Sequence, residues 1–159
     1  IKKDPIFLQK CVHESMRLHP ASPVAWRKPT CPVKIEKSTH LKEDDLLVMD
    51  LYTANRDVAI FGEDAHTFNP NRKLKSHQNL WGLTFGIGLH MCFGRDLDGG
   101  VSPNPETDPS KHQYGVVTLL IKKLFEHNVQ RDPKNKPERD LKTERPNWGK
   151  YPVIFGEKQ

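Results

Sequence analysis

Cys92 is the residue whose surroundings most favour chemistry, because three glycines lie within the twelve residues from Leu83 to Gly94. Glycine lets the backbone curl closely around a side chain, so that N–H groups can point at the cysteine sulfur. That arrangement suits a thiolate bound to a metal, and the alternative is a free, buried cysteine. A dinucleotide loop would need a third glycine three positions after Gly88, where Met91 stands instead, and the phosphate-loop pattern GxxxxGK is also missing.

Glu14 and Arg17 form a second pair of interest, three residues apart on an expected helix. Such pairs are common, and each stabilises an isolated helix by only about 0.2–0.5 kcal/mol. Glu14 borders an apolar stripe, however, and an ionised carboxylate in such a place needs full pairing. We therefore expect a second cation from elsewhere in the chain.

The helix that carries this pair is predicted over Pro5–Leu18. Asp4 and Pro5 have the residue types of an N-cap and a first helical position, and no breaker follows before His19. The apolar residues of this segment follow the helical period, which places Glu14 at the flank of the buried face.

The middle of the chain is expected to fold into short elements and a loop. Alternating residues predict strands at Val33–Glu36 and Leu46–Tyr52, which we expect to pair as a small antiparallel sheet. A short helix fits Thr53–Phe61. Few apolar residues recur periodically over Gly62–Gly82, which predicts an irregular, ordered loop, and long loops of this kind are usually functional.

The last third is expected to contain an insertion and a core helix. Gly, Pro, Ser, Asn and Asp dominate residues 98–111, which predicts a flexible surface insertion. Helical spacing of apolar residues predicts a helix over His112–His127. A charged loop over Asn128–Lys150 and a closing strand at Tyr151–Phe155 complete a chain that is mainly α with small β-sheets.

Composition narrows the function classes. The 159 residues include 25 Lys and Arg against 20 Asp and Glu, a net charge of +5 that is spread along the chain. This length fits one domain or a piece of a larger one. The clustered basic element of a nucleic-acid module is missing, and three cysteines without a CxxC pair exclude a disulfide framework or a zinc cluster.

Targeting signals are also missing from the sequence. It has neither a signal peptide nor an apolar run of about 18 residues, so we expect a soluble chain, cytoplasmic or facing the cytosol. Because the chain begins at Ile1 without an initiator methionine, we expect a missing N-terminal half or a second chain to complete it. Membrane attachment through such a part stays open.

The run Phe85-Gly-Ile-Gly-Leu-His-Met-Cys-Phe-Gly94 satisfies FxxGxxxCxG and closely resembles the haem-binding loop of the cytochrome P-450 superfamily. Three more matches follow the family's order and extend the resemblance over about Pro5–Leu97. They are Glu14-Ser-Met-Arg17-Leu-His-Pro, similar to the ExxR helix, Ala54-Asn-Arg-Asp57, similar to the turn that follows, and Phe68-Asn-Pro-Asn-Arg72, similar to the loop that returns a second arginine.

The resemblance implies that residues 1–159 are the C-terminal haem-binding portion of a larger P-450-like domain. Its cofactor would be haem b, with Cys92 as the proximal thiolate ligand of the iron, where electron donation assists cleavage of the O–O bond. Phe85 would shield the sulfur, and the N–H groups of Phe93 and Gly94 would hydrogen-bond it. Gly88 and Gly94 would keep the turn tight.

Two further residues would orient the cofactor and two would line the substrate pocket. His90 and Arg27 are similar in position to the family's partners of the haem propionates; for His90 the alternative is a solvated loop histidine. Val24 and Ala25 resemble the segment that lines the family's pocket for an apolar small molecule; ordinary packing is the alternative for both.

Other residues would have supporting roles. Glu14, Arg17 and Arg72 would form a buried network that braces the cysteine loop. Lys73, Lys75 and Arg95 could steer an acidic redox partner, a reductase or a ferredoxin, with plain solvent exposure as the alternative.

The sequence also departs from the family pattern. Asp98 stands where relatives have a small residue in a continuing helix, so that helix is expected to break and resume near His112. The family's oxygen-activating helix, with its acid–alcohol pair, has no equivalent ahead of Glu14.

The leading hypothesis is a monooxygenase that inserts one oxygen atom from O2 into an apolar substrate once the missing part completes it. The insertion suggests an alternative, a peroxide-dependent enzyme that rearranges fatty-acid hydroperoxides. A third hypothesis is a non-catalytic haem-binding chain that needs a partner polypeptide.

Overall fold

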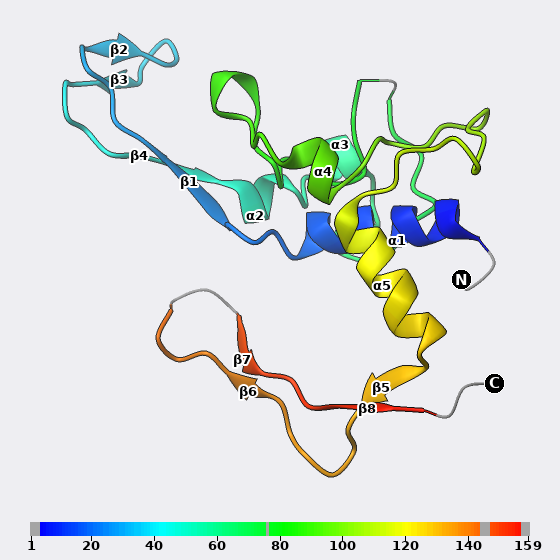
Figure 1. Cartoon of the computed structure of the whole chain (residues 1–159). Coiled ribbons are helices and arrows are strands. Elements are labelled where there is room, and N and C mark those ends of the chain that lie inside the picture. The colour runs from blue at the N-terminus through cyan, green and yellow to red at the C-terminus, as the bar shows by residue number, and fades with distance from the viewer. Residues whose placement is uncertain (1–3, 76, 144–146, 157–159) are drawn as a thin grey trace.

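The computed structural model describes residues 4–75, 77–143 and 147–156, which form helices, small antiparallel sheets and long irregular loops. This is the mainly helical architecture with small sheets that the sequence predicts. Figure 1 shows helix α1 (Pro5–Leu18) near the middle, with a loop-rich layer on one side and helix α5 (Val116–Glu126) crossing beside it.

Helix α1 begins and ends where the sequence predicts. The Asp4 carboxylate accepts a hydrogen bond from the Phe7 amide at 2.9 Å, and Pro5 occupies the first turn, where its missing N–H costs nothing. Gln9, His13 and Arg17 recur every fourth residue and therefore lie along one face, and all three are fully buried. This polar face organises the surrounding loops.

The predicted pairing of Val33–Glu36 with Leu46–Tyr52 is wrong. Instead, β1 (Val24–Arg27) pairs with β4 (Leu47–Asp50), and β2 (Val33–Lys34) pairs with β3 (His40–Leu41). Strand β1 fits between Pro23 and Pro29, because prolines block a ladder only at the positions that they occupy. The two sheets form an arm with β2 and β3 at its far end (Figure 1).

The predicted helix over Thr53–Phe61 is two short helices, α2 (Leu51–Ala54) and α3 (Val58–Phe61). Asp50 caps the first, and Asp57 caps the second by accepting from the Ala59 amide at 2.8 Å. Asp57 has an extended backbone conformation (φ −65°, ψ 117°), which interrupts the helix between Ala54 and Val58. Residues 62–75 and 77–82 then form the irregular loop that the sequence predicts, and we call these residues the meander.

The cysteine loop leads into an interrupted helix. The 3-10 turn η1 (Gly88–His90) precedes Cys92, and helix α4 (Arg95–Asp98) follows it. Residues 100–114 then leave the helical path and return to it; we call this segment the excursion. The Val101 amide donates to the Gln113 carbonyl at 3.0 Å, so the two ends of the excursion meet.

Helix α5 starts at Val116, four residues after the predicted start, because the chain from His112 to Gly115 closes the excursion instead. The charged loop predicted over Asn128–Lys150 is also wrong in part. The region contains short, exposed strands whose polar sequences lack the alternation that signals a strand. The pairs are β5 (Val129–Arg131) with β8 (Val153–Phe155), and β6 (Glu138–Arg139) with β7 (Trp148–Lys150).

The centre of the molecule is polar. The buried apolar core is small, and the largest fully buried side chains are Arg17, His13, Gln9, Glu14, Asn55 and Thr118. Buried polar groups are costly unless they are hydrogen-bonded, so the fold near α1 depends on satisfying them. Across the described ranges, we find no helix with the length and apolar character needed to cross a bilayer.

Candidate functional site

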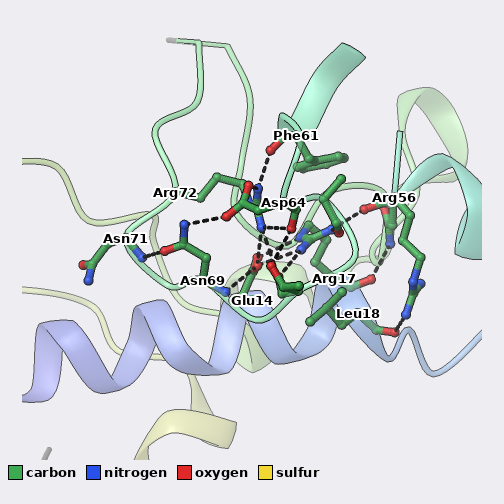
Figure 2. Close-up of polar contacts among 12 residues, drawn as sticks. Glu14, Arg17, Leu18, Arg56, Phe61, Asp64, Asn69, Asn71 and Arg72 are labelled. Atoms are coloured by element: carbon green, nitrogen blue, oxygen red, sulfur yellow. Dashed lines mark hydrogen bonds and ion pairs between the residues drawn. The ribbon is translucent and has the colours of Figure 1, made fainter. Parts of the chain in front are cut away.

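Glu14, Arg17 and Arg72 meet in a buried ion-pair network between α1 and the meander (Figure 2). The Arg17 guanidinium grips both carboxylate oxygens of Glu14 at 2.7 Å. Arg72 supplies the second cation, with its Nη2 atom 3.1 Å from Glu14 Oε1. The Glu14 carboxylate therefore has a bidentate partner in Arg17 and a second cation in Arg72. Its negative charge is compensated although the residue is fully buried.

The two arginines also hold the backbone of the meander. Arg17 donates to the carbonyl of Ala65 at 2.7 Å and to that of Asn55. Arg72 donates to the carbonyls of Asp64 and Thr67 at 2.9 and 3.1 Å. A guanidinium has five N–H donors in a fixed fork, so two arginines can order several turns of a loop without regular secondary structure.

Two further meander residues complete this network: Asn69, which lies in the Phe68-Asn-Pro-Asn-Arg72 match, and Asp64, which the sequence analysis did not name. The Asn69 amide donates to Glu14 Oε1 at 3.0 Å, and the Asn69 side chain donates to the Asp64 carboxylate at 2.8 Å. This hydrogen bond is the largest cause that lowers the pKa of Asp64, and the adjacent Arg72 guanidinium lowers that pKa further. Asp64 therefore stays ionised as a partner of Arg72.

Asn55 connects α1 to the start of the cysteine loop. Its fully buried side chain donates to the Arg17 carbonyl at 3.1 Å and accepts from the Leu83 amide at 2.6 Å. Thr84, next to Leu83, donates through its hydroxyl to the Met16 carbonyl at 2.8 Å. In the sequence, only the Ala54-Asn-Arg-Asp57 match pointed to this region. The contacts themselves were not predictable, because the Arg17 carbonyl and the Leu83 amide are distant from Asn55 in sequence.

The loop around Cys92 is a tight, exposed turn. The Cys92 amide donates to the Phe85 carbonyl at 2.8 Å, which closes the loop. Gly86 and Gly88 have φ values of 70° and 67°, in the left-handed region that favours glycine. Gly94 has another role: a Cβ atom there would lie 3.7 Å from the Cys92 Sγ atom, so glycine leaves room beside the sulfur.

The surroundings of Cys92 fit a large apolar ligand that is bound through sulfur. The thiol is exposed at a hollow of about 280 Å³, which Leu89, Met91 and Phe93 help to line. Leu89 and Phe93 are fully exposed, and such clustered apolar side chains mark a surface that binds something. Within the described residues, the N–H groups of Phe93 and Gly94, which directly follow Cys92, have no hydrogen-bond partner.

The other predicted site residues lie on neighbouring elements. His90 is exposed at the end of η1, and Val24, Ala25 and Arg27 are half-buried on β1. The Arg27 guanidinium donates to the Trp26 carbonyl at 2.7 Å. The Phe85 ring packs edge-on against Trp81, with 5.7 Å between the ring centroids. Arg95 pairs with Asp96 at 2.6 Å, and this hydrogen bond lowers the pKa of Asp96.

Gln9 and His13 are a further pair that the sequence analysis did not single out. Both are fully buried and reach the junction where the excursion begins and ends. The His13 Nε2 atom lies 2.6 Å from the Gly99 carbonyl oxygen, so the ring donates there as a neutral imidazole. Burial lowers the pKa of His13 from 6.5 to about 4, against the opposing effect of that hydrogen bond.

The lowered pKa of His13 predicts acid sensitivity. Between pH 6.5 and about 4 the unfolded chain binds a proton at His13 that the folded chain does not. Stability should therefore fall as the pH falls through this window, by about 3 kcal/mol from this residue when the shift is complete. Urea unfolding of the wild type and of His13→Gln should give a stability difference that is constant above pH 7 and shrinks towards pH 4. A difference independent of pH would contradict the assignment.

Comparisons with known proteins identify the family to which the chain belongs, over a range that includes the cysteine loop. The cytochrome P450 family, written here cytochrome P-450, matches residues 5–97. The cytochrome P-450 monooxygenase asR2 of Sarocladium schorii is 34% identical over 98 residues, which are 57% of this chain and 19% of that protein. The bifunctional cytochrome P-450/NADPH–P-450 reductase ascE of Acremonium egyptiacum is 30% identical over 100 residues, 56% of this chain and 9% of that protein.

The solved structures agree with the family match. Substrate-free CYP109E1 from Bacillus megaterium superposes with a TM-score of 0.70 at 18% identity, over 99% of this chain and 36% of that one. The chain spans 19% of the length of asR2 and 9% of that of ascE, a fifth or less of either relative. Together with the FxxGxxxCxG loop and the ion-pair network, the match over residues 5–97 shows that this chain belongs to the cytochrome P-450 family.

Proposed function

We propose that this chain is the haem-thiolate portion of a monooxygenase, with the Cys92 thiolate as the proximal ligand of haem b. The observation that carries the proposal is the Cys92 loop itself. An exposed thiol lies among exposed apolar side chains, beside two N–H groups that have no partner within the described residues. When bound, the haem iron would supply oxygen activation, which no side chain can perform.

The residues of the chain would divide the remaining work. Phe93 and Gly94 would donate their N–H groups to the thiolate and adjust its electron donation. Leu89 and Phe93 would cover the apolar edge of the porphyrin, while His90 and Arg27 would hold its propionates. Val24 and Ala25 on β1 would line the pocket of an apolar substrate. The ion-pair network would keep the loop in shape for haem.

Haem titration tests the assignment to Cys92. The double variant Cys11→Ala, Cys31→Ala retains Cys92 as its single cysteine. We expect it to bind haem in a one-to-one ratio and to give the strongly red-shifted ferrous–carbon monoxide band of a thiolate ligand, as the wild type does. The unshifted band of histidine-ligated haem in both proteins would contradict the proposal.

The reaction class is tested by what turnover requires. A monooxygenase, once completed by the rest of the P-450 fold, needs O2 and a reductant to oxygenate an apolar substrate. Turnover of a fatty-acid hydroperoxide without NAD(P)H would instead support the peroxide-dependent alternative. Stoichiometric thiolate–haem binding by the isolated chain would exclude dependence on a partner polypeptide for haem binding.

Lys73 and Lys75 are proposed to steer an acidic redox partner. They line a cleft of about 770 Å³ together with Lys10, and none of the three has an ion-pair partner among the described residues. Arg95 contributes less, because Asp96 neutralises it. We expect Lys73→Glu with Lys75→Glu to slow the first electron transfer about fivefold at low salt, since steering depends on charge. Lys134→Glu, on the distant β5–β6 connection, is the control and should change it little.

A further inference from the structure

The excursion begins and ends at the same place, and that place faces α1. A Cβ atom on Gly115 would lie 2.4 Å from the Gly99 carbonyl carbon, so the backbones of these two residues are in direct contact. Helix α4 therefore ends beside the place where α5 starts. A broken helix leaves carbonyl and N–H groups without helical partners on each side of the break.

Gln9 and His13 supply the partners that the break removes. His13 Nε2 bonds the Gly99 carbonyl at 2.6 Å, and Gln9 Nε2 donates to the Val101 carbonyl at 2.6 Å. Gln9 Oε1 accepts from the Gly115 amide at 3.0 Å, directly before the first residue of α5. Two neighbouring turns of α1 thus satisfy both sides of the break.

His13 also contacts the segment that begins the cysteine loop. Its ring meets Trp81 edge-on, with 4.6 Å between centroids, and Trp81 packs in the same way on Phe85. The Phe85 carbonyl accepts from the Cys92 amide. The Phe85 ring is so close to Gly99 that a Cβ atom there would lie 3.0 Å from it. One side chain therefore contacts Trp81, which packs on the first residue of the loop, and the carbonyl of Gly99, directly after the helix α4 that follows the loop.

We propose that His13 is a positioning residue for Cys92: its ring, against Trp81, and its Nε2–H group, at Gly99, hold the segments on both sides of the cysteine loop in one arrangement. The role of Cys92 as a haem ligand comes from the proposed function, whereas the contacts of His13 do not depend on it. Because Nε2 donates to a carbonyl, Nδ1 carries no proton, and within the described chain Nδ1 has no partner. The His13 ring therefore acts through one N–H donor, to Gly99, and one aromatic contact, with Trp81.

Two variants separate the two contacts. His13→Phe keeps an aromatic ring against Trp81 but cannot donate to Gly99, and His13→Gln keeps a donor but has no ring. Hydrogen exchange in the haem-free full chain reports on each end. The Asp98 and Gly99 amides donate within the last turn of α4, and the Cys92 amide donates to Phe85.

We expect a crossed result. His13→Phe should lower the protection of the Asp98 and Gly99 amides about tenfold and that of Cys92 less, while His13→Gln should do the reverse. His66→Phe changes an exposed histidine and should alter none of them. The Asn69 amide, bonded to Glu14, serves as an internal reference for the rest of the fold.

The outcomes decide between positioning and general stability. Equal losses at both ends and at Asn69 would overturn the proposal, as would protection unchanged in both variants. If His13→Phe does not fold, the selective loss at Cys92 in His13→Gln remains the test. In the haem-loaded chain, both variants should lower the fraction of the red-shifted carbon monoxide band at unchanged haem content. If the wild type itself shows no such band while the crossed pattern holds, the proposed function fails and the positioning role stands.

Discussion

Replacing Cys92 by serine should abolish the red-shifted ferrous–carbon monoxide band without unfolding the chain. The Cys92 side chain is exposed, and the loop is closed by its backbone amide rather than by its sulfur. Exposed substitutions of this kind usually change stability by less than about 0.5 kcal/mol. A serine hydroxyl cannot replace the electron donation of a thiolate to iron, so the spectrum should change completely.

The informative control is Cys31→Ser, which alters another exposed cysteine. It should keep the band at full intensity. The measurement is the reduced carbon monoxide spectrum of each variant after haem titration, together with its urea unfolding midpoint. A Cys92→Ser protein that retains the red-shifted band would refute Cys92 as the ligand.

Replacing Glu14 by alanine should lower the stability of the whole fold, whereas Cys92→Ser should remove only the ligand of the iron. The change leaves the guanidinium groups of Arg17 and Arg72 buried without their shared carboxylate. Removing one partner of a buried pair costs about 3–5 kcal/mol, a large share of the roughly 5–15 kcal/mol that stabilises a domain. The meander should detach from α1, and haem binding should be lost with it.

Glu126→Ala provides the matched control, because Lys123 and Glu126 form an ion pair with the same three-residue spacing on α5. This pair is exposed, so its removal should leave the unfolding midpoint and haem binding unchanged. Urea unfolding followed by far-ultraviolet circular dichroism measures both variants. A Glu14→Ala protein as stable as Glu126→Ala would show that the network contributes little.

Local signals in the sequence predicted the elements that local chemistry determines. The Asp4 cap and Pro5 fixed the start of α1, and the glycine pattern marked the turn around Cys92. The same reasoning required a second cation for Glu14, and Arg72 lies where that cation was needed. These features depend on neighbours within a few residues or on a strongly patterned motif.

The individual roles that the sequence did not reveal, even for Asn55 and Asn69 within matched motifs, depend on distant backbone groups. Asn55, Asn69 and His13 are ordinary polar residues by type, and each matters because a particular carbonyl or amide from another segment faces it. Strand β1 lies between Pro23 and Pro29, and its four residues carried no predicted strand. Polar side chains and short strands that gain their partners only on folding leave no periodic signal.

The meeting of Gly100 and Tyr114 at the base of the excursion has a consequence for how this chain can vary in length. Since the two ends already touch, residues can be added or removed at the tip, around Asn104–Asp108, without displacing α4 or α5. Each doubling of such a closed segment costs only about 0.6 kcal/mol in entropy. The tip is therefore a place where a reporter peptide can be inserted without moving the two helices.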